Sequence, residues 1–216
     1  MPTRVALTER TIAEAALALI DQEGIDGLSM RKLAGVLGSA PMAVYTYFPD
    51  RNAVLDAAAQ VLYGLIEAPT DESLPPEETV RRIMHAVRAV INAHPRAASL
   101  ITRYPPRTAD ALAFVEAGFR SFRRAGISPQ DTARSYRALV AYSIGTAEIE
   151  VNGYFGAYPA TSVTGASMDE PSFARHLPNV LEVAPALAGQ DDAEEFDYGL
   201  NLMLESVAHR RDRDSA

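Results

Sequence analysis

Residues 29–48, SMRKLAGVLGSAPMAVYTYF, constrain the fold more than any other stretch of the chain. Met30 and Leu33 recur at helical spacing, so one face of a first short helix can be buried. Gly38 can adopt the left-handed conformation that ends this helix, and Pro41 suits the first position of the next helix. Two short helices joined by a tight turn are typical of a helix-turn-helix, whose second helix can enter the major groove of DNA.

Helical patterns flank this segment on both sides, and no segment shows the alternation of a strand. Thr8 can cap a first helix that runs to about Glu23, with an apolar stripe that begins at Ile12. The sequence therefore predicts an all-α fold. Further helices are expected over residues 51–66, 76–93, 95–103, 108–125, 128–152 and 191–209.

A polar, proline-rich connector at residues 68–76, APTDESLPP, divides these helices into two groups. We expect a three-helix helix-turn-helix DNA-binding domain over residues 1–67 and a helical ligand-binding and dimerisation domain over residues 76–209. Residues 153–170 are rich in small and turn-forming residues, which predicts a long mobile loop. Residues 210–216 are expected to form a disordered tail.

The composition argues against several classes of function. The 216 residues include no cysteine, which removes disulfides, thiolate metal sites and cysteine nucleophiles. The four histidines are scattered, so neither a metal site nor a cofactor is expected. No nucleophile elbow or phosphate-binding loop is present, which indicates that the protein is not an enzyme. Because the chain lacks an apolar run of membrane-spanning length, we expect a cytoplasmic protein without membrane contact.

The charge balance is unusual for a nucleic-acid-binding protein. The net charge is −8, and residues 1–66 carry seven acidic and five basic side chains. A basic footprint is therefore absent at the level of the domain. It can still exist locally, because Arg31, Lys32 and Arg51 cluster around the second helix of the helix-turn-helix. We expect few phosphate contacts and a shallow salt dependence of DNA binding.

Residues 24–59 resemble the DNA-binding domain of the tetracycline-repressor (TetR) family of transcriptional regulators. Two departures from the family pattern are Tyr47, where histidine is usual, and Ala40, where a serine cap is common. A missing cap side chain weakens a helix start by roughly 1 kcal/mol. The residues that carry the resemblance are Leu28, Ser29, Arg31, Leu33, Ala34, Leu37, Gly38, Tyr45, Phe48, Arg51 and Leu55.

The second helix of the motif should present no arginine, lysine, asparagine or glutamine outward, so bidentate base recognition from this helix is unavailable. Arg31, on the preceding helix, is then the best candidate to contact guanine. Met42 and Ala43 are expected to contact thymine methyl groups, and Thr46 a base edge or a phosphate. The resemblance implies phosphate contacts for Tyr45 and Arg51. The full set of candidate DNA contacts is Thr8, Arg31, Lys32, Ala40, Pro41, Met42, Ala43, Tyr45, Thr46, Tyr47 and Arg51. The alternative is that the tyrosines pack and the basic residues form a solvated surface.

Residues 128–152 and 191–209 resemble the two helices that form a four-helix dimer interface in the tetracycline-repressor C-terminal domain. Gly145 and Gly199 would allow close helix approach, and an apolar stripe follows the last helix. The resemblance implies a homodimer that binds a palindromic operator. The alternative is that the stripe packs on its own subunit. The predicted interface residues are Gly145, Phe196, Gly199, Leu200, Met203 and Val207.

An effector cavity is expected between residues 76 and 152. Where the tetracycline repressor holds a magnesium-bound drug with histidine and glutamate, this chain has Ile101 and Ile149, and its polar contacts fall near Ile83 and Val87. The resemblance therefore implies a small lipophilic effector without a metal. Candidate polar contacts are Arg103, Tyr104, Tyr142, Thr146 and Glu148, each of which could equally be a surface or core side chain.

Together these features predict a ligand-responsive DNA-binding transcriptional regulator, a repressor that a small lipophilic effector releases from double-stranded operator DNA. Two alternatives remain open at this stage. One is an enzyme whose helical pocket hides an acid–base pair, which turnover of a bound ligand would reveal. The other is a helix-turn-helix co-regulator that does not read DNA, which sequence-specific binding at moderate salt would exclude.

Overall fold

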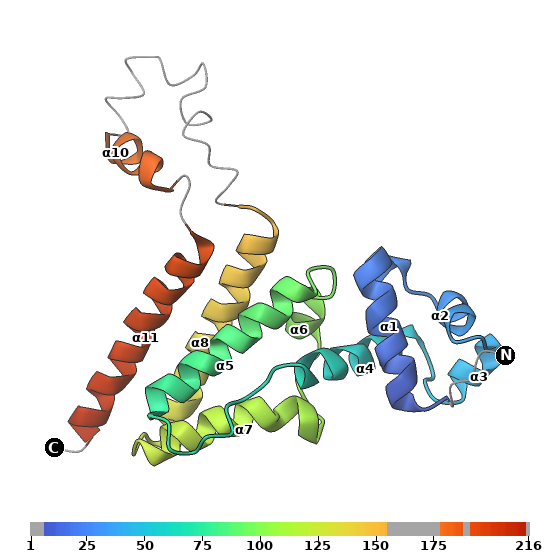
Figure 1. The fold of residues 1–216 in the computed structure, drawn as a ribbon, viewed down its shortest axis with the longest axis horizontal. Coiled ribbons are helices and arrows are strands. Elements are labelled where there is room, and N and C mark those ends of the chain that lie inside the picture. Colours follow the sequence, from blue (N-terminus) through green and yellow to red (C-terminus); the bar gives the residue numbers. More distant parts are fainter. Residues whose placement is uncertain (1–6, 155–177, 188–190, 215–216) are drawn as a thin grey trace. The chain divides into compact units, whose positions relative to one another are not determined.

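The computed structural model describes residues 7–154, 178–187 and 191–214, and every regular element among them is a helix (Figure 1). Two compact units are present. Met1–Val140 contains the first seven α-helices and the first half of α8, and Ala141–Ala216 contains the rest. The elements are α1 (Glu9–Glu23), the 3₁₀-helix η1 (Ile25–Gly27), α2 (Met30–Val36), α3 (Pro41–Tyr45), α4 (Arg51–Gly64), α5 (Pro76–Ala93), α6 (Ser99–Arg103), α7 (Ala109–Arg124), α8 (Pro129–Val151), α10 (Pro178–Leu187) and α11 (Asp192–Asp214).

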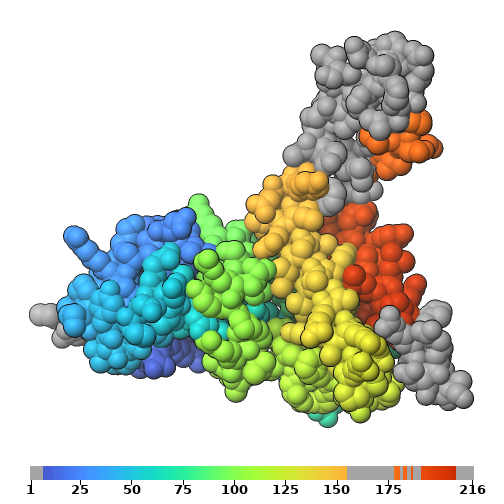
Figure 2. Space-filling model, turned by 180° about the vertical axis from the view of Figure 1, so that it is seen from behind, coloured from blue at the N-terminus to red at the C-terminus, as the bar shows by residue number. Residues whose placement is uncertain are grey.

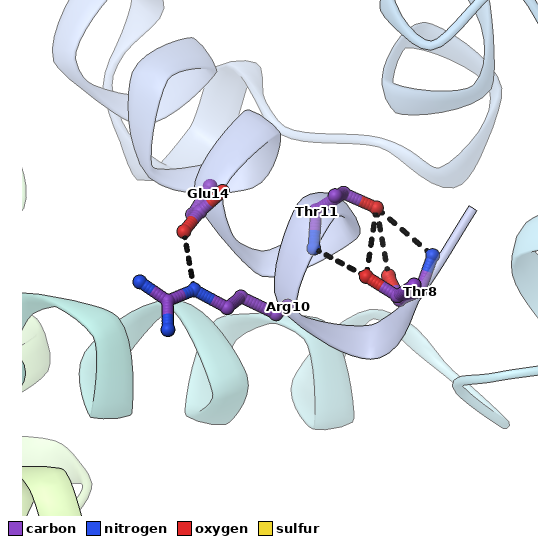
Figure 3. A network of polar contacts seen from close by, with 4 residues as sticks. All are labelled: Thr8, Arg10, Thr11 and Glu14. Carbon is purple, nitrogen blue, oxygen red and sulfur yellow. Dashed lines mark hydrogen bonds and ion pairs between the residues drawn. The ribbon is translucent and has the colours of Figure 1, made fainter. Parts of the chain in front are cut away.

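Local capping explains where the first helices begin. Thr8 and Thr11 form a reciprocal capping box at the start of α1, where Thr8 Oγ1 accepts from Thr11 N at 3.1 Å and Thr11 Oγ1 accepts from Thr8 N at 2.9 Å (Figure 3). Ser29 Oγ accepts from Lys32 N at the start of α2. Ala40 provides no such bond at α3, but Pro41 occupies its first turn. The predicted helix starts are thus confirmed, including the uncapped one.

The helix-turn-helix is held by a small apolar core and a glycine turn. Gly38 has φ 60°, the left-handed conformation that the sequence predicted at the end of α2. Leu33 from α2 and Val44 from α3 are fully buried, as is Leu55 from α4. Because α1 packs on both α2 and α4, the short α2 and α3 are fixed by tertiary contacts and need little helical stability of their own.

α4 extends from the helix-turn-helix into the helices that follow, where it packs against α6 and α7. Tyr63 Oη donates to the Ile101 carbonyl at 2.7 Å, and Gln60 accepts from Arg107 N at 2.7 Å and donates to the Pro105 carbonyl at 3.1 Å. The first compact unit therefore includes helices on both sides of the proline-rich connector.

The C-terminal helices follow the predicted order with three differences. α6 begins at Ser99, although the sequence predicted a helix from residue 95. α5 has the predicted limits of 76 and 93, and Thr108 caps α7 by accepting from Ala111 N at 3.2 Å. α11 continues to Asp214, so residues 210–214 are helical where a disordered tail was expected. α10 was not predicted, and the predicted loop at 153–170 lies mostly outside the described residues.

Within the second unit, α11 lies along the C-terminal half of α8 in both views (Figures 1 and 2). Phe196 and Leu200 of α11 are almost fully buried, and Ser143 and Ala147 of α8 are buried as well. In the part of the chain that the structure describes, no helix is both long enough and apolar enough to span a membrane.

Candidate nucleic-acid interface and effector cavity

The outer face of α2 and α3 carries most of the predicted DNA contacts. Met42 is 74% exposed and Tyr45 is 44% exposed, although both have large apolar surfaces that a helix would normally bury. Ala43 is half-buried. Val44 faces inward and fixes the orientation of α3. The other exposed candidates on this face are Arg31, Lys32, Ala40, Pro41, Thr46 and Tyr47.

The two basic residues at the start of α2 differ in their surroundings. Lys32 Nζ forms an ion pair with the Glu23 carboxylate at the end of α1. Arg31 is exposed, and no ion pair joins it to another described residue. The positive charge of Lys32 is therefore partly neutralised, whereas that of Arg31 remains available. Val36, which sequence reasoning overlooked, is 61% exposed at the end of α2.

Three predicted hydroxyl contacts already have partners within the protein. Thr46 Oγ1 donates to the Met42 carbonyl at 3.1 Å, and Tyr47 Oη donates to the Leu7 carbonyl at 2.8 Å. The Thr8 hydroxyl belongs to the capping box of α1 (Figure 3). Tyr47 thereby joins the segment just after α3 to the segment just before α1.

The Arg51 guanidinium, for which a phosphate contact was expected, has hydrogen-bond partners within the protein. Its Nε donates to the Leu28 carbonyl at 2.8 Å, and one terminal nitrogen donates to the Ile25 carbonyl. The side chain is half-buried and ties the η1 turn to α4. These carbonyls precede Arg51 by more than twenty residues, so no local pattern could have predicted the contact.

An apolar cavity of about 10 Å³ lies among α5, α7 and the first half of α8. Ile83, one of the predicted ligand contacts, lines it; the predicted Val87 and Ile101 are buried but lie outside its lining. Arg103 is exposed at the end of α6 and Tyr104 is half-buried. The lining residues are Val80, Ile83, Met84, Phe114, Val115, Gly118, Phe122, Tyr136 and Leu139.

Tyr136 is the cavity residue with a hydroxyl group, and sequence reasoning did not select it. Its ring packs edge-on against Phe119 with centroids 5.1 Å apart. Burial raises the pKa of Tyr136 above its ordinary value. The position of this residue on the cavity wall depends on how α8 packs, which the sequence pattern does not reveal.

The other predicted ligand contacts lie in the second unit, and two of their polar groups are already paired. Tyr142 Oη donates to the Phe196 carbonyl at 2.9 Å. Thr146 Oγ1 donates to the Tyr142 carbonyl at 2.7 Å. Glu148 and Ile149 are half-buried on the same helix. This geometry favours the core-side-chain alternative for Tyr142 and Thr146.

The predicted dimer stripe on α11 is largely covered within its own subunit. Phe196, Leu200 and Val207 are buried there, and Met203 is half-buried. Gly199 accommodates the Tyr142 ring. Gly145 of α8, in contrast, has open space around the position that a Cβ atom would take.

The uncovered face of α11 carries two other large apolar residues. Tyr198 is 66% exposed and Leu202 is 53% exposed. They are four residues apart and lie one turn from each other on the same face. Among the described residues, no group of three or more histidine or acidic side chains could hold a metal ion.

Comparisons with known proteins agree along almost the whole chain. Residues 12–58 match the bacterial regulatory proteins of the tetR family, and residues 69–211 match the tetracyclin repressor-like C-terminal domain. An HTH-type transcriptional regulator of Saccharopolyspora erythraea is 28% identical over 212 residues, which cover 95% of this chain and 86% of the relative.

Solved structures share the fold. Apo ActR of Streptomyces coelicolor superposes with a TM-score of 0.84 at 22% identity, covering 96% of this chain and 98% of ActR. ActR has also been solved in complex with actinorhodin. BioQ with its double-stranded DNA operator gives a TM-score of 0.64 at 23% identity, covering 94% of this chain and 99% of BioQ. The helix-turn-helix, the C-terminal helices and these matches together show that the chain belongs to the tetR family of bacterial transcriptional regulators, which are not enzymes.

Proposed function

We propose that this regulator is a repressor that binds a palindromic operator as a homodimer and leaves it when a small lipophilic effector binds. The observation that carries the proposal is the exposed surface of α2 and α3, where Arg31 has no ion pair with a described residue. BioQ, a structural neighbour, was solved with operator DNA, and ActR with actinorhodin. Binding to chromosomal DNA implies a cytoplasmic location.

We propose different roles for the candidate DNA-binding residues, in line with their contacts in the structure. Arg31 supplies bidentate donors for guanine. Met42 and Val36 offer apolar contact to thymine methyl groups, and Tyr45 offers a hydroxyl to a phosphate. Thr8 and Arg51 act indirectly, because their polar groups hold α1 and the η1 turn in place. With Lys32 neutralised by Glu23, few phosphate contacts remain, so operator affinity should depend only weakly on salt.

The effector is lipophilic. The residues that line the cavity are apolar or aromatic, and the surface that faces the cavity is entirely apolar. No charged side chain lines the cavity, so a charged ligand would lose its hydration without compensation. These features support a neutral aromatic or polycyclic molecule, and the absence of polar metal ligands in the lining supports a metal-free one.

The dimer interface uses the face of α8 and α11 that the subunit leaves uncovered. Tyr198 and Leu202 supply the apolar area, and Ala141 and Gly145 of α8 are small enough to allow close helix approach. The apolar stripe predicted from the sequence stabilises this interface indirectly, because its Phe196 fixes α11 against α8 in each subunit. A dimer has two copies of α3, the recognition helix of the helix-turn-helix. Such a dimer suits an operator with two half-sites about one DNA turn apart.

Release follows from linkage between the two sites. An effector that binds preferentially to a dimer whose recognition helices no longer match the half-site separation must weaken operator binding. Operator DNA must then weaken effector binding by the same factor. Unequal factors at equilibrium would contradict a two-state repressor.

Selection of fragmented genomic DNA by the purified protein, followed by anisotropy titration, tests this function. Arg31→Ala should cost about 1–3 kcal/mol of binding free energy and relax the preference at one base pair in each half-site. Lys32→Ala is the matched control and should have a smaller effect. An equal loss on all sequences would make Arg31 a phosphate contact, and the absence of any selected sequence would contradict the proposal.

A further inference from the structure

A polar cluster joins the end of α1 to the turn between α5 and α6, and we call it the α1–α5 latch. It consists of Asp21 and Gln22 on α1 together with His94 and Arg96 in the turn. His94 Nδ1 lies 2.8 Å from Asp21 Oδ2. Arg96 donates through one terminal nitrogen to the Gln22 carbonyl and, at 3.3 Å, to the Asp21 carbonyl. The latch joins residues more than seventy positions apart, entirely within the first unit.

The charges of the latch suit the end of α1. The last turn of α1 contains no basic residue, although its free carbonyls favour a nearby cation. Arg96 supplies that cation from outside the helix. Asp21 Oδ1 is buried and has no hydrogen-bond partner among the described residues. The Asp21 carboxylate thus depends on His94 for its polar contact. Displacement of His94 would leave the carboxylate without that contact in a poorly solvated position.

α5 connects the latch to the cavity. Val80, Ile83 and Met84 of α5 form one wall of the cavity, and His94 is the C-cap of the same helix. The cavity holds about 10 Å³, whereas pockets for small molecules hold about 300–1,000 Å³. An effector can therefore enter only if the walls move apart. Because a helix moves nearly as a rigid body, displacement of the α5 wall also moves His94.

The segment just before α1 contacts the segment just after α3, the recognition helix. The Leu7 carbonyl, just before α1, accepts the hydrogen bond from Tyr47 at the end of α3. α1 is an uninterrupted helix of 15 residues and also packs on α2 and α4. It can consequently carry a displacement of its C-terminal end to the DNA-binding face.

We propose that the α1–α5 latch couples effector binding to the orientation of the recognition helix. His94 and Arg96 are the positioning residues, and α1 is the helix that carries the displacement. The inference rests on the proposed repressor function. It adds a route to the helix-turn-helix that is separate from the contacts of α4 with α6 and α7.

A double-mutant cycle tests the latch without knowledge of the effector. A Cβ atom at Gly118 would lie 3.7 Å from Ile83 Cδ1, so a larger side chain there must push on α5. Gly118→Leu serves as the surrogate for a bound effector, and Gly118→Ala as its control that fits. His94→Ala opens the latch, and Arg82→Ala, which removes an exposed ion pair with Glu78 on α5, is the control for it.

The readout is the affinity for a selected operator duplex, measured for folded variants as judged by circular dichroism. Gly118→Leu should weaken binding at least about tenfold in the native and Arg82→Ala backgrounds, within the usual range of allosteric coupling. In the His94→Ala background the same substitution should change the affinity by less than about twofold, the limit expected of independent sites. Gly118→Val replaces Gly118→Leu if the larger side chain prevents folding.

Equal effects of the cavity substitution in all three backgrounds would overturn the latch, because they would make His94 merely structural. An unchanged affinity for every cavity variant would also overturn it. Failure of the unmodified protein to bind any selected duplex is a different result, which contradicts the repressor function itself.

Discussion

Gly199→Ala should destabilise the protein, although alanine normally stabilises a helix. Gly199 lies inside α11, where alanine would be favoured over glycine by about 1 kcal/mol. An added Cβ atom would, however, lie 2.6 Å from Cζ and 2.8 Å from Cε2 of Tyr142. The Oη atom of Tyr142 would be nearer still to the added Cβ atom. These separations are far inside van der Waals contact, so the tyrosine ring must move.

The cost of that movement can be worked out from the contacts of Tyr142. The ring stacks on Phe196 with centroids 5.5 Å apart, a contact worth about 0.5–1.5 kcal/mol. Its hydroxyl donates to the Phe196 carbonyl at 2.9 Å, which contributes about 1 kcal/mol. Overpacking adds about 1–3 kcal/mol. After the helix-propensity gain of about 1 kcal/mol is subtracted, the net loss is roughly 1.5–4.5 kcal/mol of unfolding free energy.

Urea denaturation at one fixed protein concentration measures this loss. Gly35→Ala is the matched control, because nothing lies within 4 Å of a Cβ atom at Gly35, and it should stabilise the protein or leave it unchanged. In a Tyr142→Leu background the ring is gone, so Gly199→Ala should also cease to destabilise. A stabilising Gly199→Ala in the native background would refute the reasoning.

Three further substitutions test other parts of the structure. Arg51→Ala should lower the unfolding free energy by about 1.5–3 kcal/mol, because charge-assisted hydrogen bonds to two carbonyls are lost, and a thermal melt would show it; an unchanged melt with weaker DNA binding would restore the phosphate role. Tyr63→Phe should cost about 1 kcal/mol, since the hydrogen bond to the Ile101 carbonyl is lost. Burial raises the pKa of Tyr63 to about 12, whereas an unfolded tyrosine ionises near 10. The stability that the neutral Tyr63 phenol contributes is therefore fully present below pH 10 and falls as the pH rises towards 12. Denaturation at a series of pH values should show a smaller alkaline loss of stability for the phenylalanine variant. Leu202→Glu should convert dimers to folded monomers in sedimentation experiments, and an intact dimer would contradict the interface over Tyr198 and Leu202.

Much of the fold could be predicted because its signals are local. Caps at Thr8, Ser29 and Thr108 lie within three residues of the groups that they bind, so sequence spacing alone located the helix starts. The turn at Gly38 was equally local. The apolar periodicity of α5 gave both of its ends, since one face is buried along its whole length.

The roles of individual side chains were harder to predict, because they depend on contacts between distant segments. Arg51 was expected to meet phosphate, but its position near the η1 turn arises only when α4 packs under the helix-turn-helix. Phe196 fitted both an intersubunit stripe and a subunit core, and periodicity cannot tell which surface covers it. The latch at Asp21 and His94 has no sequence signal at all.

Sequence-specific binding to operator DNA is the central claim, and an equilibrium anisotropy titration tests it most directly. The labelled duplex would come from immediately upstream of the protein's own gene, with a scrambled duplex as competitor at about 150 mM salt, where non-specific binding is micromolar or weaker. The account predicts nanomolar saturation at one dimer per operator, a specificity ratio of about 10³ or more. Equal affinity for the scrambled duplex and for every fragment selected from the genome would contradict it.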